Sequence, residues 1–96
     1  MGMSISVSEK IRAIRDSEGM GRKAFADKLG ISQRTLESIE NKGTDPSSSI
    51  LKAICKGYPA YTFWLTLDTV NPEIGQISPE LKETASEYGK TGTDTE

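Results

Sequence analysis

The sequence contains no histidine, and this absence excludes several kinds of chemistry. Without an imidazole there is no Ser-His or Cys-His nucleophile pair and no histidine ligand for a metal ion. The single cysteine, Cys55, has no second thiol with which to share a metal or to form a disulfide within the chain. The chain also lacks a Walker loop and a dinucleotide-binding glycine motif. We therefore expect no metal site, no cofactor and no enzymatic activity.

Long apolar runs are missing as well. No apolar stretch approaches the ~20 residues that a membrane-spanning helix requires. The sequence does not open with a basic segment followed by an apolar one, so we expect neither a secretory signal nor a membrane partner. A lone cysteine suits a reducing cytoplasm, and 96 residues, of which 34% are hydrophobic, support one modest core. These features predict a small cytoplasmic protein.

Charged residues are plentiful but unevenly placed. The net charge of the chain is −2. Residues 1–65 hold ten Lys and Arg against seven Asp and Glu, whereas residues 66–96 hold two against seven. The first two thirds therefore carry +3 and the remainder carries −5. Because the local field decides contact with phosphate, the total charge does not argue against a polyanionic partner for the first part.

Residues 22–41 predict two short helices joined by a tight turn. Phe25, Ala26 and Leu29 share one face at helical spacing. Gly30 follows at once, at the place where a helix ends in the left-handed conformation that suits a residue without Cβ. The small Ala26 side chain would let two crossing helices approach closely.

The second of these helices is predicted over residues 33–41. Ile31 points inward, Ser32 supplies a capping hydroxyl, and Leu36 and Ile39 continue the apolar face. The polar side chains that face outward are those of Gln33, Arg34, Glu37, Ser38 and Asn41. This is the helix-turn-helix arrangement, whose second helix lies in the major groove of DNA.

The chain from about Val7 to Leu67 resembles the lambda repressor/Cro-like family of helix-turn-helix domains. The residues that carry the resemblance are the small Ala26, the turn Gly30, the apolar Leu29, Ile31, Leu36 and Ile39, and the closing segment 39–43. The resemblance implies an all-α, compact five-helix DNA-binding domain, encoded by a bacterium or a phage. One departure is Gly21-Arg22, where the family usually has Ser/Thr-Gln, so we expect a weaker helix cap at residue 21.

The remaining elements follow from local signals. Ser6 and Glu9 form a capping box that opens a first helix ending near Gly19. Ser47 or Ser48 caps a fourth helix, which breaks at residues 57–59. The fifth helix is predicted over residues 60–67.

A domain boundary is predicted after residue 67. Residues 68–78 contain Asn-Pro, Gly and Ser and are typical of a linker. Ser78-Pro79-Glu80 then begins a short acidic helix, and residues 89–96 have the composition of a disordered tail. Residues 1–67 are thus expected to form the DNA-binding domain, and residues 68–96 a helical extension.

Five side chains of the second helix-turn-helix helix are candidates for base readout. Gln33 can bond adenine N6 and N7, and Arg34 can bond guanine O6 and N7. Thr35 can offer its methyl group to thymine or its hydroxyl to phosphate. Glu37 can accept from cytosine N4 but repels phosphate, and Ser38 points outward beside it. Family members read bases mainly with the first two or three exposed positions, which implies the strongest roles for Gln33 and Arg34.

Phosphate contacts are expected at both ends of the motif. Arg22 and Lys23 open the first helix, where a phosphate clamp would profit from free N–H groups. A solvated polar face is the alternative. Asn41, Lys42 and Thr44 would lie beside the DNA backbone just beyond the second helix.

Two further expectations come from the resemblance. An Arg and a Glu at the positions of Arg15 and Glu40 form a partly buried ion pair in the family; the alternative is two unrelated surface charges. Family members also commonly dimerise through the region of the fifth helix. The dimer-interface candidates there are Tyr61, Trp64, Leu65 and Leu67. The alternative is that all the rings pack within one monomer.

Two functions fit this pattern. The first is a sequence-specific transcriptional regulator, expected to be a repressor, that binds a palindromic operator in double-stranded DNA as a homodimer. The second is an antitoxin-like or other protein-interaction module, which would use the aromatic helix 60–67 and the acidic tail to bind a partner protein. Co-purification of a stable partner would favour the second.

Overall fold

The computed structural model describes residues 5–82, and within them the predicted helices are present. The elements are α1 (Val7–Ser17), α2 (Arg22–Leu29), α3 (Gln33–Lys42), α4 (Ser48–Gly57), the 3-10 turn η1 (Pro59–Tyr61), α5 (Thr62–Leu67) and the 3-10 turn η2 (Pro72–Ile74). The predicted all-α, five-helix class is confirmed. Most of the predicted acidic helix and the tail over 89–96 lie outside the described residues.

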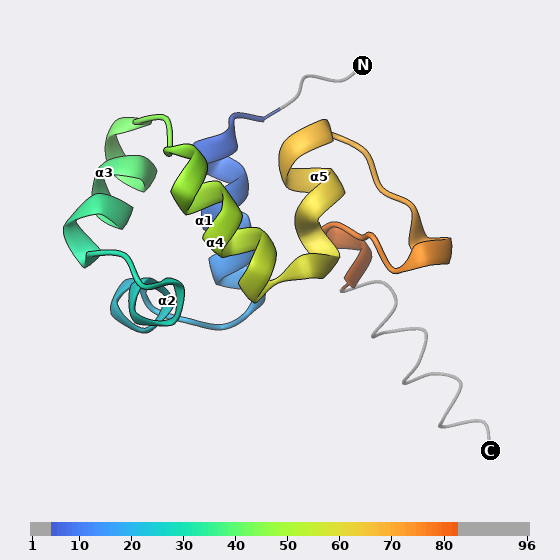
Figure 1. Ribbon diagram of the computed structural model, residues 1–96, viewed down its shortest axis with the longest axis horizontal. Helices are drawn as coiled ribbons and strands as arrows, with labels where there is room; N and C mark the ends of the chain where they lie inside the picture. Colours follow the sequence, from blue (N-terminus) through green and yellow to red (C-terminus); the bar gives the residue numbers. More distant parts are fainter. Residues whose placement is uncertain (1–4, 83–96) are drawn as a thin grey trace.

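The helices surround one core (Figure 1). α1 and α4 lie at its centre, with α2 and α3 packed on one side and α5 on the other. The side chains at the centre of the core are Ile11, Ile14, Phe25, Leu36, Ile39, Ile54 and Leu65, all almost completely buried. Because helical spacing brings the apolar residues of each helix to one side, these side chains converge from every α-helix. The core therefore holds α3 in a defined orientation.

Local capping explains where the helices begin. The Ser6 hydroxyl accepts from the Glu9 amide at 3.1 Å, and the Glu9 carboxylate accepts from the Ser6 amide at 3.2 Å. The capping box is confirmed. At α4 it is Ser47 that caps, accepting from the Ile50 amide at 3.3 Å. The start of α2 has no side-chain cap, as expected for Gly21.

The fifth helix begins differently from the prediction. A 3-10 turn precedes α5, because the Tyr61 amide donates to the Tyr58 carbonyl three residues back, at 3.1 Å. Pro59 has no amide hydrogen to donate, and this position is compatible with the first residue of such a turn. The α-helix itself starts at Thr62.

A buried lysine attaches the end of α5 to α1. The Lys10 ammonium donates to the Trp64 carbonyl at 3.0 Å and to the Asp68 carboxylate, and it lies over the Trp64 ring. Burial lowers the pKa of Lys10. Asp68 ends α5 in the left-handed conformation, with φ 57°. The ion pair therefore fixes the end of α5 relative to α1.

The segment predicted as a linker lies against the domain. The Gln76 side chain accepts from the Phe63 amide and donates to the Pro59 carbonyl, both at 2.9 Å. The Ser78 hydroxyl accepts from the Leu81 amide at 3.2 Å, as expected for a cap, and residues 79–82 are helical. None of the helices within residues 5–82 is long and apolar enough to cross a membrane.

Candidate nucleic-acid interface

Gly30 makes the turn between α2 and α3. Its backbone lies in the left-handed region, with φ 75° and ψ 28°, which glycine adopts without steric cost. The Ile31 amide donates to the Ala26 carbonyl at 3.0 Å and closes the end of α2. Ser32 then caps α3 by accepting from the Thr35 amide at 3.0 Å. The chain thus reverses within three residues and places α3 across α2.

The second helix of the motif, α3, has one buried side and one open side. Leu36 and Ile39 are buried in the core. Gln33, Arg34, Asn41 and Lys42 are exposed, while Thr35, Glu37 and Ser38 are partly exposed. The polar edge predicted to face solvent is therefore turned outward over the whole length of α3.

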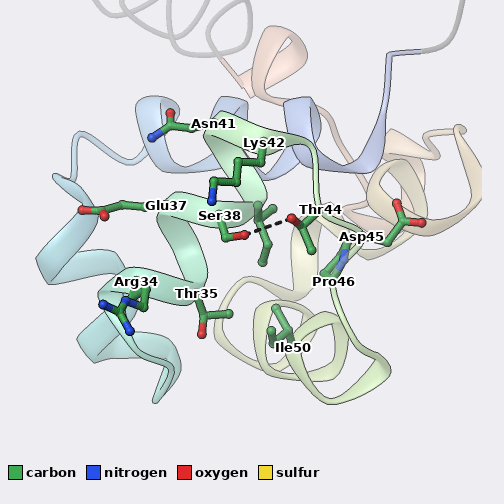
Figure 2. A pocket seen from close by; sticks show the side chains of 11 residues that line it. Arg34, Thr35, Glu37, Ser38, Asn41, Lys42, Thr44, Asp45, Pro46 and Ile50 are labelled. Carbon is green, nitrogen blue, oxygen red and sulfur yellow. Dashed lines mark hydrogen bonds between the residues drawn. The ribbon is translucent and has the colours of Figure 1, made fainter.

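A broad hollow of about 680 Å³ runs along this edge (Figure 2). One wall is α3, and the other is the loop of residues 43–47 together with the start of α4. The side chains that line it are Arg34, Thr35, Glu37, Ser38, Ile39, Asn41, Lys42, Thr44, Asp45, Pro46 and Ile50. Both walls therefore belong to the same face of the molecule.

Four of the five predicted base-reading side chains, all except Arg34, have side-chain partners within residues 5–82. The Gln33 amide donates to the Glu37 carboxylate at 3.0 Å. The Ser38 hydroxyl lies 2.9 Å from the Thr44 hydroxyl. These contacts leave the outer edge of Gln33 open but turn Ser38 toward the 43–47 loop.

The hydroxyl of Thr35 is also occupied. It accepts from the Ser32 hydroxyl at 2.7 Å. Because Thr35 only accepts in this contact, its own O–H remains able to donate to a phosphate, and its methyl group remains able to contact a base.

Arg34 and Lys42 are the two uncommitted cations of α3. Neither makes an ion pair or a side-chain hydrogen bond with another residue in the range 5–82. Both side chains are exposed on the hollow. Arg34 stands at the first turn of α3 and Lys42 at its last residue, so their charges are placed at opposite ends of the helix.

Glu40 lies beneath this face, between two arginines. Its carboxylate accepts from Arg15 at 2.8 and 2.9 Å and from Arg22 at 3.0 Å, and its side chain is 0% exposed. Burial alone raises the pKa of Glu40, but hydrogen bonds from Arg15 and Arg22 outweigh burial and hold the pKa below its usual value. The predicted pair of Arg15 and Glu40 is present and joins α1 to α3.

Arg22 is turned inward rather than toward a ligand. In addition to Glu40, its guanidinium donates to the Asn41 side-chain oxygen at 3.4 Å. Of the two residues predicted to clamp phosphate at the start of α2, Arg22 is thus engaged with Glu40 and Asn41. Lys23 makes an exposed pair with Asp27 at 3.3 Å, one helical turn away, which phosphate could displace.

The loop after α3 is held by a residue that the sequence did not single out. The Ser8 hydroxyl donates to the Thr44 carbonyl at 3.3 Å, from a buried position on α1. Asp45 and Pro46 are further lining residues that were not predicted. A separation of 36 residues between Ser8 and Thr44 leaves no local pattern from which this contact could be found.

The four candidates for the dimer interface separate into two groups. Tyr61 and Leu65 are buried in the monomer's core, and the Tyr61 hydroxyl donates to Glu18 at 2.9 Å. Trp64 is partly buried against the core, whereas Leu67 is 63% exposed. Burial within the monomer corrects the expectation for Tyr61 and Leu65, because core side chains cannot also contact a second chain.

A second hollow lies between α4 and α5. Its volume is about 450 Å³, and it is lined by Ser48, Leu51, Lys52, Cys55, Lys56 and Thr66. No group of three or more His, Cys, Asp or Glu side chains that could hold a metal ion occurs among the residues that the structure describes.

Comparisons with known proteins agree with this geometry. A family model described as helix-turn-helix matches residues 11–65. Repressor protein C of Escherichia phage P2 is 34% identical over 99 residues, which cover 94% of this chain and all of that protein. The solved structure of Pf6r, from the filamentous phage Pf6 of Pseudomonas aeruginosa PA01, superposes with a TM-score of 0.67 and 28% identity, over 79% of this chain and 97% of that one.

Proposed function

The chain belongs to the helix-turn-helix family, of the lambda repressor/Cro-like type, and is a DNA-binding transcriptional regulator; we propose that it represses transcription as a homodimer whose α3 helices read a palindromic operator in the major groove. We assign operator binding to residues 1–67 and an accessory role to residues 68–96, at the bacterial nucleoid and without enzymatic activity.

The single observation that carries this proposal is the open polar edge of α3. Its two buried residues, Leu36 and Ile39, hold the helix on the core while the opposite edge remains exposed. A free guanidinium on the first turn matches guanine O6 and N7, and the neighbouring amide of Gln33 matches adenine. We therefore assign base readout chiefly to Arg34 and Gln33, with Thr35 beside them.

Backbone contacts are assigned to the groups that flank this edge. Lys42 lies exposed at the end of α3, and Asn41 and Thr44 stand on either side of it. The Asn41 oxygen is engaged by Arg22, so its amide N–H groups remain to donate to a phosphate. Lys23 supplies a cation at the start of α2. These contacts would position the protein without carrying sequence information.

The homodimer is supported by the apolar surface on the side of α5. Leu67 is exposed and directly follows Thr66, which lines the hollow together with Leu51 and Cys55. A twofold pairing of such surfaces would present two α3 helices to half-sites about 34 Å apart, one turn of DNA. The same surface could instead bind a different protein, and a stable heteromeric partner that blocks homodimer formation would favour the antitoxin-like alternative.

The test is a gel-shift titration against an operator obtained by random-oligonucleotide selection, at two salt concentrations. Arg34→Ala should reduce discrimination at one base pair by about 1–3 kcal/mol while leaving binding to unrelated DNA less affected. Lys42→Ala should weaken all sequences alike and lower the salt slope by about one. An equal loss on every sequence for Arg34→Ala would remove Arg34 from base readout.

A further inference from the structure

The first residue of α3 is held by a residue one turn later. Gln33 is exposed, and its side-chain nitrogen donates to the Glu37 carboxylate at 3.0 Å. The two residues are four apart on the same helix, which is the spacing at which side chains meet. The pair lies on the edge of α3 that we assign to base readout, so the contact constrains the group that would face a base.

A carboxylate partner allows a side-chain amide only one of its two orientations, the one with the nitrogen toward the carboxylate. An ionised carboxylate accepts hydrogen bonds and cannot donate them. Glu37 therefore attracts the nitrogen of the Gln33 amide and repels its oxygen. The N–H that points away from the carbonyl is the one that reaches Glu37 without bringing the two oxygens together. The carbonyl oxygen and the remaining N–H stay free, side by side on the outer edge of the amide.

The free edge of the Gln33 amide carries a donor and an acceptor that are complementary to one base in the major groove. Adenine presents an acceptor at N7 and a donor at N6 in the major groove, whereas guanine presents two acceptors, N7 and O6. One N–H beside one carbonyl oxygen matches the adenine pair. Facing guanine, the Gln33 oxygen would meet O6, and turning the amide to avoid this contact would break the bond to Glu37.

The charge of Glu37 opposes DNA binding in general. Glu37 makes no ion pair with any cation in the part of the chain that the structure describes. A carboxylate on this face repels phosphate at every sequence. Its contribution to a DNA-binding surface must therefore lie in selectivity rather than in affinity.

We infer that Glu37 is a positioning residue, which orients the Gln33 amide so that α3 selects adenine over guanine at the base pair facing Gln33. This inference rests on the proposed function and deepens it. It also replaces the expectation that Glu37 itself accepts from cytosine N4.

The experiment measures dissociation constants of the full chain for the selected operator and for its substitutions at each position. The variants are Gln33→Ala, Glu37→Ala, Glu37→Gln and the double variant Q33A/E37A. Gln33→Ala should remove the preference at one base pair. Glu37→Ala should reduce the adenine preference at that same base pair by at least about fivefold, and the double variant should lose no more than Gln33→Ala alone.

Glu37→Gln is the matched control, because it has the length of glutamate and an oxygen that can accept the same N–H but carries no charge. Because a glutamine amide can donate as well as accept, it fixes the orientation of the Gln33 amide less strictly, and the adenine preference should fall between those of wild type and Glu37→Ala. Both Glu37 variants should bind unrelated DNA about two- to fivefold more tightly at low salt, since both remove one negative charge, and this gain should shrink as salt is added.

Several results would overturn the inference alone. One is an unchanged adenine preference in Glu37→Ala when Gln33→Ala has lost it. Another is a change in Glu37→Ala at a different base pair that prefers cytosine, which would make Glu37 a direct reader. A wild-type protein without any sequence preference would instead overturn the proposed function, and this inference with it. Circular dichroism melting of each variant should stay near wild type, because the substituted side chains lie outside the core.

Discussion

At the scale of single residues, the most constrained group is the carboxylate of Glu40. It is completely removed from solvent, yet it stays ionised because Arg15 and Arg22 together donate three hydrogen bonds to it. Removing one partner of a buried ion pair leaves an uncompensated charge, which costs far more than the loss of a pair on the surface. Glu40 therefore joins α1, α2 and α3 beneath the exposed polar edge of α3.

Glu40→Gln should lower the free energy of unfolding by about 3 kcal/mol at pH 7, because the largely buried Arg15 and the partly exposed Arg22 lose their counter-charge. The matched control is Asp27→Asn in the exposed pair with Lys23, which should change stability by less than about 0.5 kcal/mol. Urea unfolding followed by circular dichroism measures both. Similar losses for the two variants would contradict the role of burial.

The effect of Glu40→Gln on stability should depend on pH. Since the folded pKa of Glu40 lies below the ordinary value of 4.5, the contribution of the ion pair is present above that value. It is lost as the pH falls through the folded pKa. The stability difference between wild type and Glu40→Gln should therefore be largest at neutral pH and should narrow below about pH 4.5. A difference that stays constant down to pH 3 would contradict this assignment.

At the scale of secondary-structure elements, the backbone conformation of Gly30 ends α2 and allows the turn into α3. Gly30 has positive φ, and a Cβ built on it would meet no atom within 4 Å. Any cost of a substitution there is therefore conformational and not a steric clash with the surroundings. Gly21, by contrast, caps α2 in an extended conformation, with φ −76° and no side-chain hydrogen bond.

Gly30→Ala should destabilise the protein by about 1–2 kcal/mol, because alanine is forced into the left-handed region. Gly30→Asn should cost less, since asparagine tolerates that conformation. Gly21→Ser should instead stabilise by a few tenths of a kcal/mol, by adding the missing cap. The melting temperatures of the three variants, compared with that of the wild type, test this order of stability. A stabilising Gly30→Ala would show that the turn does not require the conformation seen here.

At the scale of the whole molecule, charge and apolar surface are segregated. The cations Arg34 and Lys42 lie on the edge of α3, while the exposed apolar residue Leu67 lies at the end of α5, beyond the central helices (Figure 1). One surface can therefore face DNA while the other contacts a second copy. The Lys10–Asp68 ion pair fixes the position of the α5 surface relative to the rest of the domain, because it joins α1 to the end of α5.

Leu67→Asp should weaken the proposed homodimer at least about tenfold, because it places a charge in the centre of an apolar contact. Operator binding should weaken with it, while the monomer's stability should change little. Ile74→Asp is the control, since Ile74 is 62% exposed but belongs to η2, whereas Leu67 directly follows Thr66, which lines the hollow between α4 and α5. Analytical ultracentrifugation gives the dissociation constants. Equal behaviour of the two variants would place the dimer contact elsewhere.

The sequence alone was enough to locate the helices and the outward edge of α3. The capping box at Ser6, the turn at Gly30 and the cap at Ser47 act between residues three to five apart, and such local interactions are legible in the order of residues. Helical periodicity likewise predicts which side of α3 is apolar. The first turn of the fifth helix was predicted less well, because Pro59 permits both a 3-10 and an α start.

Only the tertiary structure decided which groups meet. Arg22 reaches Glu40 across 18 residues of sequence, and Lys10 reaches Asp68 across 58. Periodicity tells which side of a helix is buried but not which neighbour buries it, so Arg22 was expected at phosphate and Tyr61 at a dimer interface. Packing in three dimensions placed Tyr61 in the core and turned the partly exposed Arg22 toward the buried Glu40, because buried rings and charges require specific partners that distant segments supply.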